Sequence, residues 1–174
     1  NSRIKERAGG GVGIECIIRG KNSNGDYFEL TPEEIIRQHY AHILIDTYGY
    51  SKEQLDFETQ VTFSGKEKNK EKRVDIVVRN KNDNKKIDLV IEVKRPKIRN
   101  EMIIDSSEAS SPYEQMKSYC NQLHPKIGVI ANGDNLLKFY DMPYYEDELG
   151  IDKFPINGED LDEWKENRRF TIKQ

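Results

Sequence analysis

The 174-residue sequence contains no run of about 18 apolar residues, and it does not open with a basic segment followed by an apolar one. We therefore expect neither a membrane span nor a secretory signal peptide. Cysteine is scarce as well, since Cys16 and Cys120 are the only two and they lie far apart in the chain. This argues against a disulfide framework and favours a reducing, cytoplasmic environment.

Several patterns that mark common enzymes are missing too. The glycine-rich stretch at residues 9–13 is not followed by Gly-Lys-Ser/Thr, which excludes a phosphate-binding loop. An ATP-driven motor would therefore have to lie elsewhere on a longer chain. The 3 histidines and 2 cysteines do not have the spacing of zinc ligands, and no Ser/His/Asp hydrolase signature is present.

Charged residues, by contrast, are abundant and unevenly distributed. They make up 34% of the chain, and the formal net charge is −3. Residues 66–99 hold 13 basic and 6 acidic residues, whereas residues 141–166 hold 10 acidic residues and two lysines. The overall acidity therefore does not exclude nucleic-acid binding at a basic face. The basic runs at 66–72 and 81–86 are equally typical of solvated hairpin loops.

The apolar pattern predicts one α/β domain. Helical spacing is found at residues 31–47 and 113–123, and strand patterns at 57–63, 73–79, 87–94, 126–131 and 136–140. This order predicts a central mixed β-sheet flanked by helices. A short strand at 14–18 and a short helix at 159–166 are also expected. We expect residues 1–13 to be a flexible segment, residues 14–142 the core, and residues 143–174 an acidic extension or a linker to further domains.

Two of these elements carry more specific local patterns. Thr31 is the expected N-cap of the first helix, with Pro32 at its first position and Glu34 closing a capping box. In the strand at residues 57–63, alternation places the odd-numbered residues, from Phe57 to Phe63, on one face of the sheet.

Acidic residues interrupt the two most apolar strands. Asp75 points away from the face that Val74, Ile76 and Val78 are expected to share, and Glu92 and Lys94 project together from the polar side of the next strand. A hairpin at residues 80–86 would bring Asp75 alongside Glu92, because neighbouring strands lie about 4.8 Å apart. Two carboxylates and an ammonium group at one strand end would suit a hard cation such as Mg²⁺. The alternative is that all three are surface charges, with Lys94 as the salt-bridge partner.

Asp75 followed by Glu92-Val93-Lys94 resembles the motif of the PD-(D/E)xK nuclease superfamily, with Val74 in place of the proline. The resemblance extends to an ordered set of motifs found in the N-terminal endonuclease domain of type I restriction R subunits and of fused restriction–modification proteins. These motifs are Arg19-Gly20-Lys21, Thr31-Pro32-Glu33-Glu34-Ile35-Ile36-Arg37-Gln38, Arg73-Val74-Asp75-Ile76-Val77 and Ile91-Glu92-Val93-Lys94, with Gln115 and Tyr119 forming a further QxxxY element.

The resemblance implies a restriction-endonuclease-like core that hydrolyses the phosphodiester bonds of foreign DNA with Mg²⁺. Asp75, Glu92 and the Val93 backbone carbonyl would hold the metal, and Lys94 would act on the attacking water. Glu34 is a further candidate ligand, although the capping box explains it equally well. Gln115, Tyr119, Arg73, Lys97 and Arg99 would support the site or contact double-stranded DNA. Methyltransferase and specificity subunits of a restriction complex are the implied partners, and ATP would act only through a separate motor domain.

Two other functions remain open at the level of sequence. The chain could be a non-catalytic nuclease-like domain that binds DNA or docks a subunit. It could also be a repair or recombination nuclease of the same superfamily. The sequence predicts neither the recognition sequence nor the oligomeric state.

Overall fold

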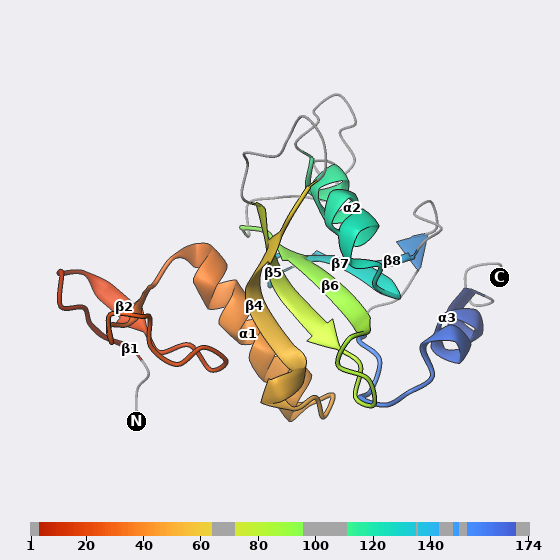
Figure 1. Ribbon diagram of the computed structural model, residues 1–174, viewed down its shortest axis with the longest axis horizontal. Coiled ribbons are helices and arrows are strands. Elements are labelled where there is room, and N and C mark those ends of the chain that lie inside the picture. Colours follow the sequence, from red (N-terminus) through yellow and green to blue (C-terminus); the bar gives the residue numbers. More distant parts are fainter. Residues whose placement is uncertain are drawn as a thin grey trace.

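The computed structural model describes residues 4–63, 72–95, 111–134, 136–142, 148–149 and 153–169. Within these residues the chain forms three α-helices, one short 3-10 helix and nine strands in two sheets (Figure 1). The helices are α1 (Pro32–Asp46), α2 (Pro112–Leu123) and α3 (Leu161–Arg169), with the 3-10 helix at Lys52–Gln54. The strands are β1 (Ile4–Glu6), β2 (Val12–Ile14), β3 (Phe28–Glu29), β4 (Leu55–Val61), β5 (Lys72–Arg79), β6 (Ile87–Val93), β7 (Ile127–Ala131), β8 (Leu137–Asp141) and β9 (Glu148–Leu149).

The larger sheet is mixed. Its strand order is β4-β5-β6-β7-β8-β9, and all neighbouring strands are antiparallel except β6 and β7, which are parallel. Parallel neighbours need a crossover connection, and α2 lies in the connection between β6 and β7. The predicted α/β class, mixed sheet and order of helix, three strands, helix and two strands are confirmed, and β9 adds a further edge strand.

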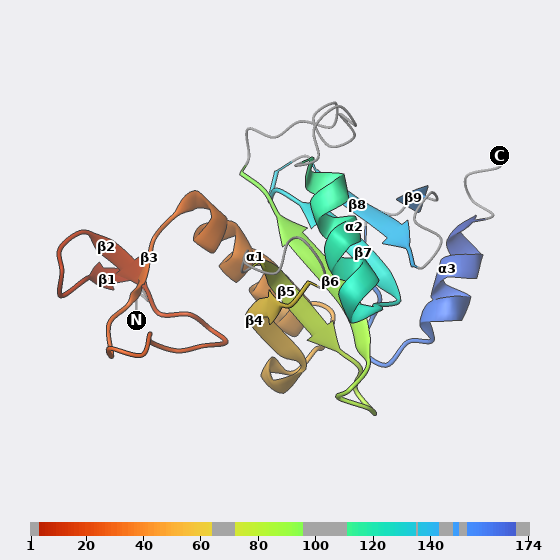
Figure 2. The same cartoon turned by 45° about the horizontal axis from the view of Figure 1, so that its top comes forward.

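Helices cover both faces of this sheet, and Figure 2 shows α2 lying across one of them. On one face, Tyr40 of α1 and Trp164 of α3 belong to the same buried cluster as Leu89 of β6. On the other face, Met116 of α2 packs in a second cluster with Val90 of β6. Consecutive residues of β6 thus enter opposite cores, as the alternation of a strand requires. The strand that carries Glu92 is therefore buried on both sides.

The described N-terminal residues form a small three-stranded sheet, and β1 and β2 lie in or next to the segment that we expected to be flexible. β2 pairs antiparallel with both β1 and β3. Gly10 and Gly11 adopt φ values of +87° and +81°, which glycine tolerates without strain, and they turn the chain between β1 and β2. The predicted strand at residues 14–18 is wrong, because β2 ends at Ile14 and Cys16 pairs with Gly20 in an isolated bridge.

Glu58 breaks the regular alternation of β4. Its φ is +52°, in the left-handed region that a residue with a side chain rarely adopts. Before it, Phe57 packs in the cluster under α1, and after it, Val61 packs in the cluster under α2. The prediction that these residues share one face is therefore wrong. On β5, Val74 likewise joins the α2 cluster while Ile76 joins the α1 cluster, which contradicts their predicted common face.

The described C-terminal residues belong to the core. Phe154, Leu161 and Trp164 are buried in the cluster under α1, and the Lys165 ammonium donates to the buried Asp141 carboxylate of β8 at 2.7 Å. These residues lie in the segment that we expected to be an acidic extension or a linker, and the short helix predicted at 159–166 is present as α3. None of the described helices is long and apolar enough to cross a membrane.

Candidate active site

β5 and β6 stop pairing at the point where each carries an acidic residue. Their antiparallel register extends to the pair Ile76–Ile91, and the next residue on each strand is Asp75 or Glu92. The Val93 N–H donates to Asp75 Oδ2 at 2.8 Å. A side-chain carboxylate thus takes a backbone donor of the neighbouring strand at the place where the ladder ends, and this fixes Asp75 beside Glu92, as the sequence predicted.

Glu92 is almost fully buried, with 2% of its surface exposed. Its Oε1 accepts a hydrogen bond from Lys94 Nζ at 2.6 Å, whereas its buried Oε2 has no hydrogen-bond partner among the described residues. Burial and the adjacent Asp75 carboxylate raise the pKa of Glu92 to about 8, and Lys94 acts in the opposite direction. Two adjacent carboxylates with one unpartnered oxygen form a site that a cation would complete.

Lys94 joins the strand to α2. Its ammonium also donates to Gln115 Oε1 at 2.8 Å, and Gln115 Nε2 donates to the Tyr119 hydroxyl at 2.9 Å. Gln115 and Tyr119 are one helical turn apart and lie on the same side of α2. The structure therefore brings the predicted Glu-x-Lys and QxxxY elements together in one hydrogen-bonded chain. Burial and the Glu92 carboxylate raise the pKa of Tyr119 to about 12, so this hydroxyl stays protonated.

Glu34 is not placed with the carboxylate pair. Thr31 caps α1 as predicted, since its hydroxyl accepts from the Glu34 N–H at 3.1 Å. The Glu34 carboxylate, however, is turned away from the cap: Arg37 and Gln38 both donate to it, Gln38 at 2.6 Å. The second half of the capping box is therefore wrong, because the buried guanidinium offers this acid a better partner than the cap does.

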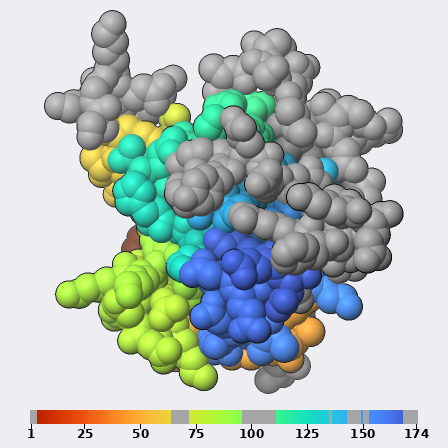
Figure 3. Space-filling view, turned by 90° about the vertical axis from the view of Figure 1, so that its right-hand side faces the viewer, coloured from red at the N-terminus to blue at the C-terminus, as the bar shows by residue number. Residues whose placement is uncertain are grey.

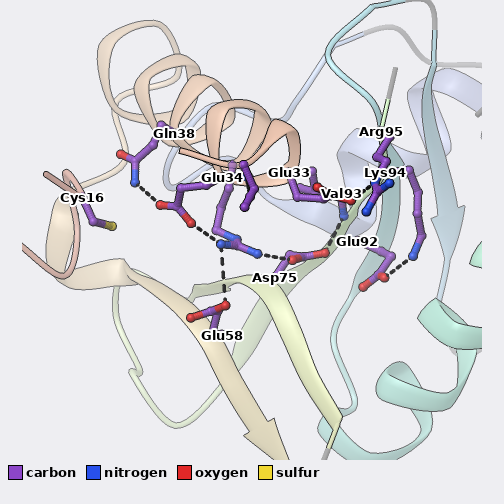
Figure 4. Close-up of polar contacts among 12 residues, drawn as sticks. Cys16, Glu33, Glu34, Gln38, Glu58, Asp75, Glu92, Val93, Lys94 and Arg95 are labelled. Atoms are coloured by element: carbon purple, nitrogen blue, oxygen red, sulfur yellow. Dashed lines mark hydrogen bonds and ion pairs between the residues drawn. The ribbon is translucent and has the colours of Figure 1, made fainter. Parts of the chain in front are cut away.

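An ion-pair network links Glu34 to the site, and the sequence predicted only part of it. Arg37 donates to both Glu34 and Asp75, the latter at 2.6 Å. Arg19 donates to Glu34 at 3.0 and 3.1 Å and also to Glu58. Figure 4 shows the Gln38 side chain directed at Glu34, and the Asp75 carboxylate directed at Val93. The spacing of three residues between Glu34 and Arg37 is a helical ion-pair signal that could have been used. No local pattern marks Glu58, which reaches the network through its unusual backbone.

The predicted DNA-contacting residues are only partly described. Arg73 lies exposed on β5, two residues before Asp75. Lys97 and Arg99 lie outside the described residues. Next to them in sequence, Arg95 is exposed and donates to Glu33 at the start of α1.

The candidate metal ligands are few. Within the described ranges, no group of three or more His, Cys, Asp or Glu residues is placed to hold a metal ion. Asp75 and Glu92 are adjacent, and Glu34 lies behind Arg37. Any divalent cation at this site would therefore need the Val93 carbonyl, water or substrate oxygens as additional ligands.

The fold is thus a mixed α/β sheet in which two neighbouring strands separate around two carboxylates and a lysine. The chain belongs to the family of the type I restriction enzyme R protein N terminus, whose model matches residues 32–155. This confirms the resemblance to the N-terminal domain of type I restriction R subunits that was identified in the sequence. All of α1 and the strands that carry Asp75 and Glu92 fall within the match.

Other comparisons add little to this assignment. No curated protein matches the chain. Among solved structures, the crystal structure of SSO0001 is similar, with a TM-score of 0.39 and 17% sequence identity over 80% of this chain. The present chain spans 58% of the length of that protein.

Proposed function

We propose that this domain is the Mg²⁺-dependent DNA endonuclease part of a type I-like restriction system and hydrolyses phosphodiester bonds of foreign double-stranded DNA. The observation that carries the proposal is the convergence of Asp75, Glu92 and Lys94, the last bonded to Gln115, at the point where β5 and β6 separate. Family membership supports the restriction setting, and the site supports the chemistry.

The residues fit a magnesium ion. Mg²⁺ prefers oxygen ligands and is commonly held by one or two carboxylates with water and substrate oxygens. Asp75 and Glu92 provide such carboxylates, and the buried Glu92 Oε2 lacks a partner among the described residues. Together with the Val93 carbonyl they would hold the ion. Bound Mg²⁺ would supply positive charge that stabilises the charge developing on the phosphate.

Lys94 is suited to act on the water that attacks the phosphate. A lysine ammonium has three N–H donors, and two of them are taken by Glu92 and Gln115. The third can orient a water molecule, and the positive charge offsets the charge of the transition state. Gln115 and Tyr119 fix the direction of Lys94. Arg73, Lys97 and Arg99 would neutralise backbone phosphates, which gives affinity without sequence information.

Selection of the cleavage site would come from partners. In the proposed system, specificity and methyltransferase subunits choose the DNA, and a motor domain uses ATP. This domain would supply the cleavage step alone.

The test is plasmid nicking with Mg²⁺ by the full-length protein assembled with its restriction partners. We expect Asp75→Ala, Glu92→Ala and Lys94→Ala each to lower the nicking rate by about 100-fold or more, the size of effect seen when one group that stabilises a transition state is removed. Lys126→Ala is the matched control, because Lys126 lies at the opposite end of the sheet, paired with Asp162 at 2.5 Å. Undiminished nicking by the three site variants would refute the proposal.

One observation favours a second candidate, a non-catalytic domain that binds DNA or docks a subunit. Both Asp75 oxygens already accept hydrogen bonds, one from Arg37 and one from Val93. Such a carboxylate could be purely structural. Calorimetry separates the two functions: Mg²⁺ or Mn²⁺ binding that is abolished in Asp75→Ala supports the enzyme, and no binding by the wild-type protein supports the docking domain.

A further inference from the structure

Arg37 occupies the centre of the ion-pair network behind the carboxylates. Its side chain is 8% exposed. One terminal nitrogen of its guanidinium donates to Asp75 Oδ1 at 2.6 Å, and the other terminal nitrogen donates to Glu34 and lies 3.7 Å from a Glu58 oxygen. Burial disfavours the charged form, but Asp75, Glu34 and Glu58 outweigh this and raise the pKa of Arg37. It is therefore a permanent cation at the back of the site.

The Glu34 carboxylate, one of the three that contact Arg37, is itself held in place by its neighbours. Glu34 is buried and accepts from Arg19 and Gln38 as well as from Arg37, so its carboxylate is fixed from several sides. Gln38 is fixed in turn, because its Oε1 accepts from the Ile17 N–H at 2.9 Å. The hydrogen-bond network around Arg37 is thus connected to the backbone of the N-terminal region as well as to α1.

Glu58 gives an independent indication that the position of the network matters. A left-handed conformation strains a residue that has a side chain, and such strain is concentrated at functional sites. The strained Glu58 backbone delivers a carboxylate to both Arg19 and Arg37. A regular β4 would keep its alternation at this point. The strand therefore departs from regular geometry at the residue whose carboxylate contacts both arginines.

The consequence for Asp75 is that both of its oxygens are oriented. Arg37 fixes Oδ1, the Val93 N–H fixes Oδ2, and each oxygen keeps a second lone pair. Groups that hold metal ligands in this way typically change metal affinity 10- to 100-fold when they are removed. We propose that Arg37 is a positioning residue of the metal site, acting through Asp75, with Glu34, Glu58 and Arg19 as its support. This inference rests on the proposed function.

A merely structural arginine would stabilise the fold without changing the site, and two substitutions distinguish the roles. Arg37→Met removes the positive charge and the N–H donors of the guanidinium group but keeps most of the length of the side chain. Arg37→Lys keeps the charge but not the two-pronged pairing with Asp75 and Glu34. The matched control is Arg79→Met, since Arg79 also makes a 2.6 Å ion pair from β5, with Asp56, away from Glu92.

The experiment is calorimetric titration of the protein with Mn²⁺, at a temperature where circular dichroism shows every variant to be folded. We expect Arg37→Met to bind Mn²⁺ 10- to 100-fold more weakly than the wild type, Arg37→Lys to lie between them, and Arg79→Met to match the wild type. In nicking assays, the Arg37 variants should need more Mg²⁺ for half-maximal rate and should regain activity at high Mg²⁺. An arginine that only stabilises the fold would not shift the metal requirement.

The outcomes separate this inference from the proposed function. Wild-type binding that is abolished in Asp75→Ala but unchanged in Arg37→Met and Arg37→Lys would overturn the inference and leave the proposed function standing. A wild-type protein that binds no Mn²⁺ would overturn both. If Arg37→Met does not fold, Arg37→Lys decides, because a wild-type affinity in that variant also contradicts a role for the two-pronged pairing.

Discussion

Gln115 connects the lysine of the site to the helix on the α2 face of the sheet. Its amide oxygen accepts from Lys94, and its amide nitrogen donates to Tyr119, so this one side chain links the other two by hydrogen bonds. Without Gln115, Lys94 would keep Glu92 as its partner and would be oriented from one direction alone. A glutamine at this position therefore has a role that its helix alone would not require.

We predict that Gln115→Leu lowers the nicking rate by about 10- to 100-fold, because a hydrogen bond to a charged group contributes roughly 1.5–3 kcal/mol. Tyr119→Phe should have a smaller effect, about 2- to 10-fold, since it removes a neutral hydrogen bond one step further from Lys94. Rates of plasmid nicking under identical Mg²⁺ measure both. Ser118→Ala on the same helix is the control, and a Gln115→Leu enzyme as fast as the wild type would show that Lys94 needs no such support.

The positions of individual site residues were predictable to different degrees. The neighbourhood of Asp75 and Glu92 follows from the hairpin that joins their strands, which is a local rule, although alternation assigned Val74 to the wrong face. Arg19 and Glu58 could not be placed this way, because they meet through contacts between distant segments and through one left-handed residue inside a strand. Glu34 was assigned from its sequence neighbours alone, and the buried arginines then determined where its carboxylate points.

At the level of secondary structure, α3 shows how an acidic segment can belong to a core. Its exposed side bears Asp162 and Glu163, while Leu161 and Trp164 are buried against the sheet. Figure 3 shows α3 on the face of the molecule next to the β5–β6 hairpin. The average composition of the segment is acidic and therefore gives no sign that Leu161 and Trp164 pack into the core. The strands and α1 and α2 have enough apolar residues in sequence to be predicted directly.

We predict that Trp164→Ala lowers the free energy of unfolding by about 3–5 kcal/mol, because replacing a buried tryptophan leaves a large cavity. Trp164 is 1% exposed and its ring lies 5.9 Å from that of Phe139 on β8. Urea denaturation followed by circular dichroism measures the change. The exposed neighbour Glu163→Ala should change the unfolding free energy by less than about 0.5 kcal/mol. Equal stability of Trp164→Ala and wild type would mean that α3 is not an integral part of the fold.

Across the whole molecule, the proposed DNA binding depends more on how charge is distributed along the chain than on the net charge. The chain carries a net charge of −3, yet the segment from residue 66 to residue 99 has 13 basic and 6 acidic residues. Within that segment, two sets of basic residues can be distinguished by their positions in the sequence. One set flanks the carboxylates in sequence, at Arg73 before Asp75 and at Lys97 and Arg99 after Lys94. The other is the exposed hairpin loop with Lys81, Lys85 and Lys86, which joins the far ends of β5 and β6.

If DNA crosses the carboxylate end of the sheet, only the first set binds phosphates. The combined Arg73→Ala, Lys97→Ala and Arg99→Ala variant should then bind DNA more weakly and reduce the slope of log affinity against log salt by about 0.9 for each phosphate that is no longer neutralised. Fluorescence anisotropy with labelled duplex DNA in Ca²⁺ across a salt series measures both quantities. The combined Lys81→Ala, Lys85→Ala and Lys86→Ala variant removes the same charge and should keep the wild-type slope. An equal reduction in the two variants would mean that DNA responds to the total charge of the domain, and the proposed path across the carboxylates would have to be abandoned.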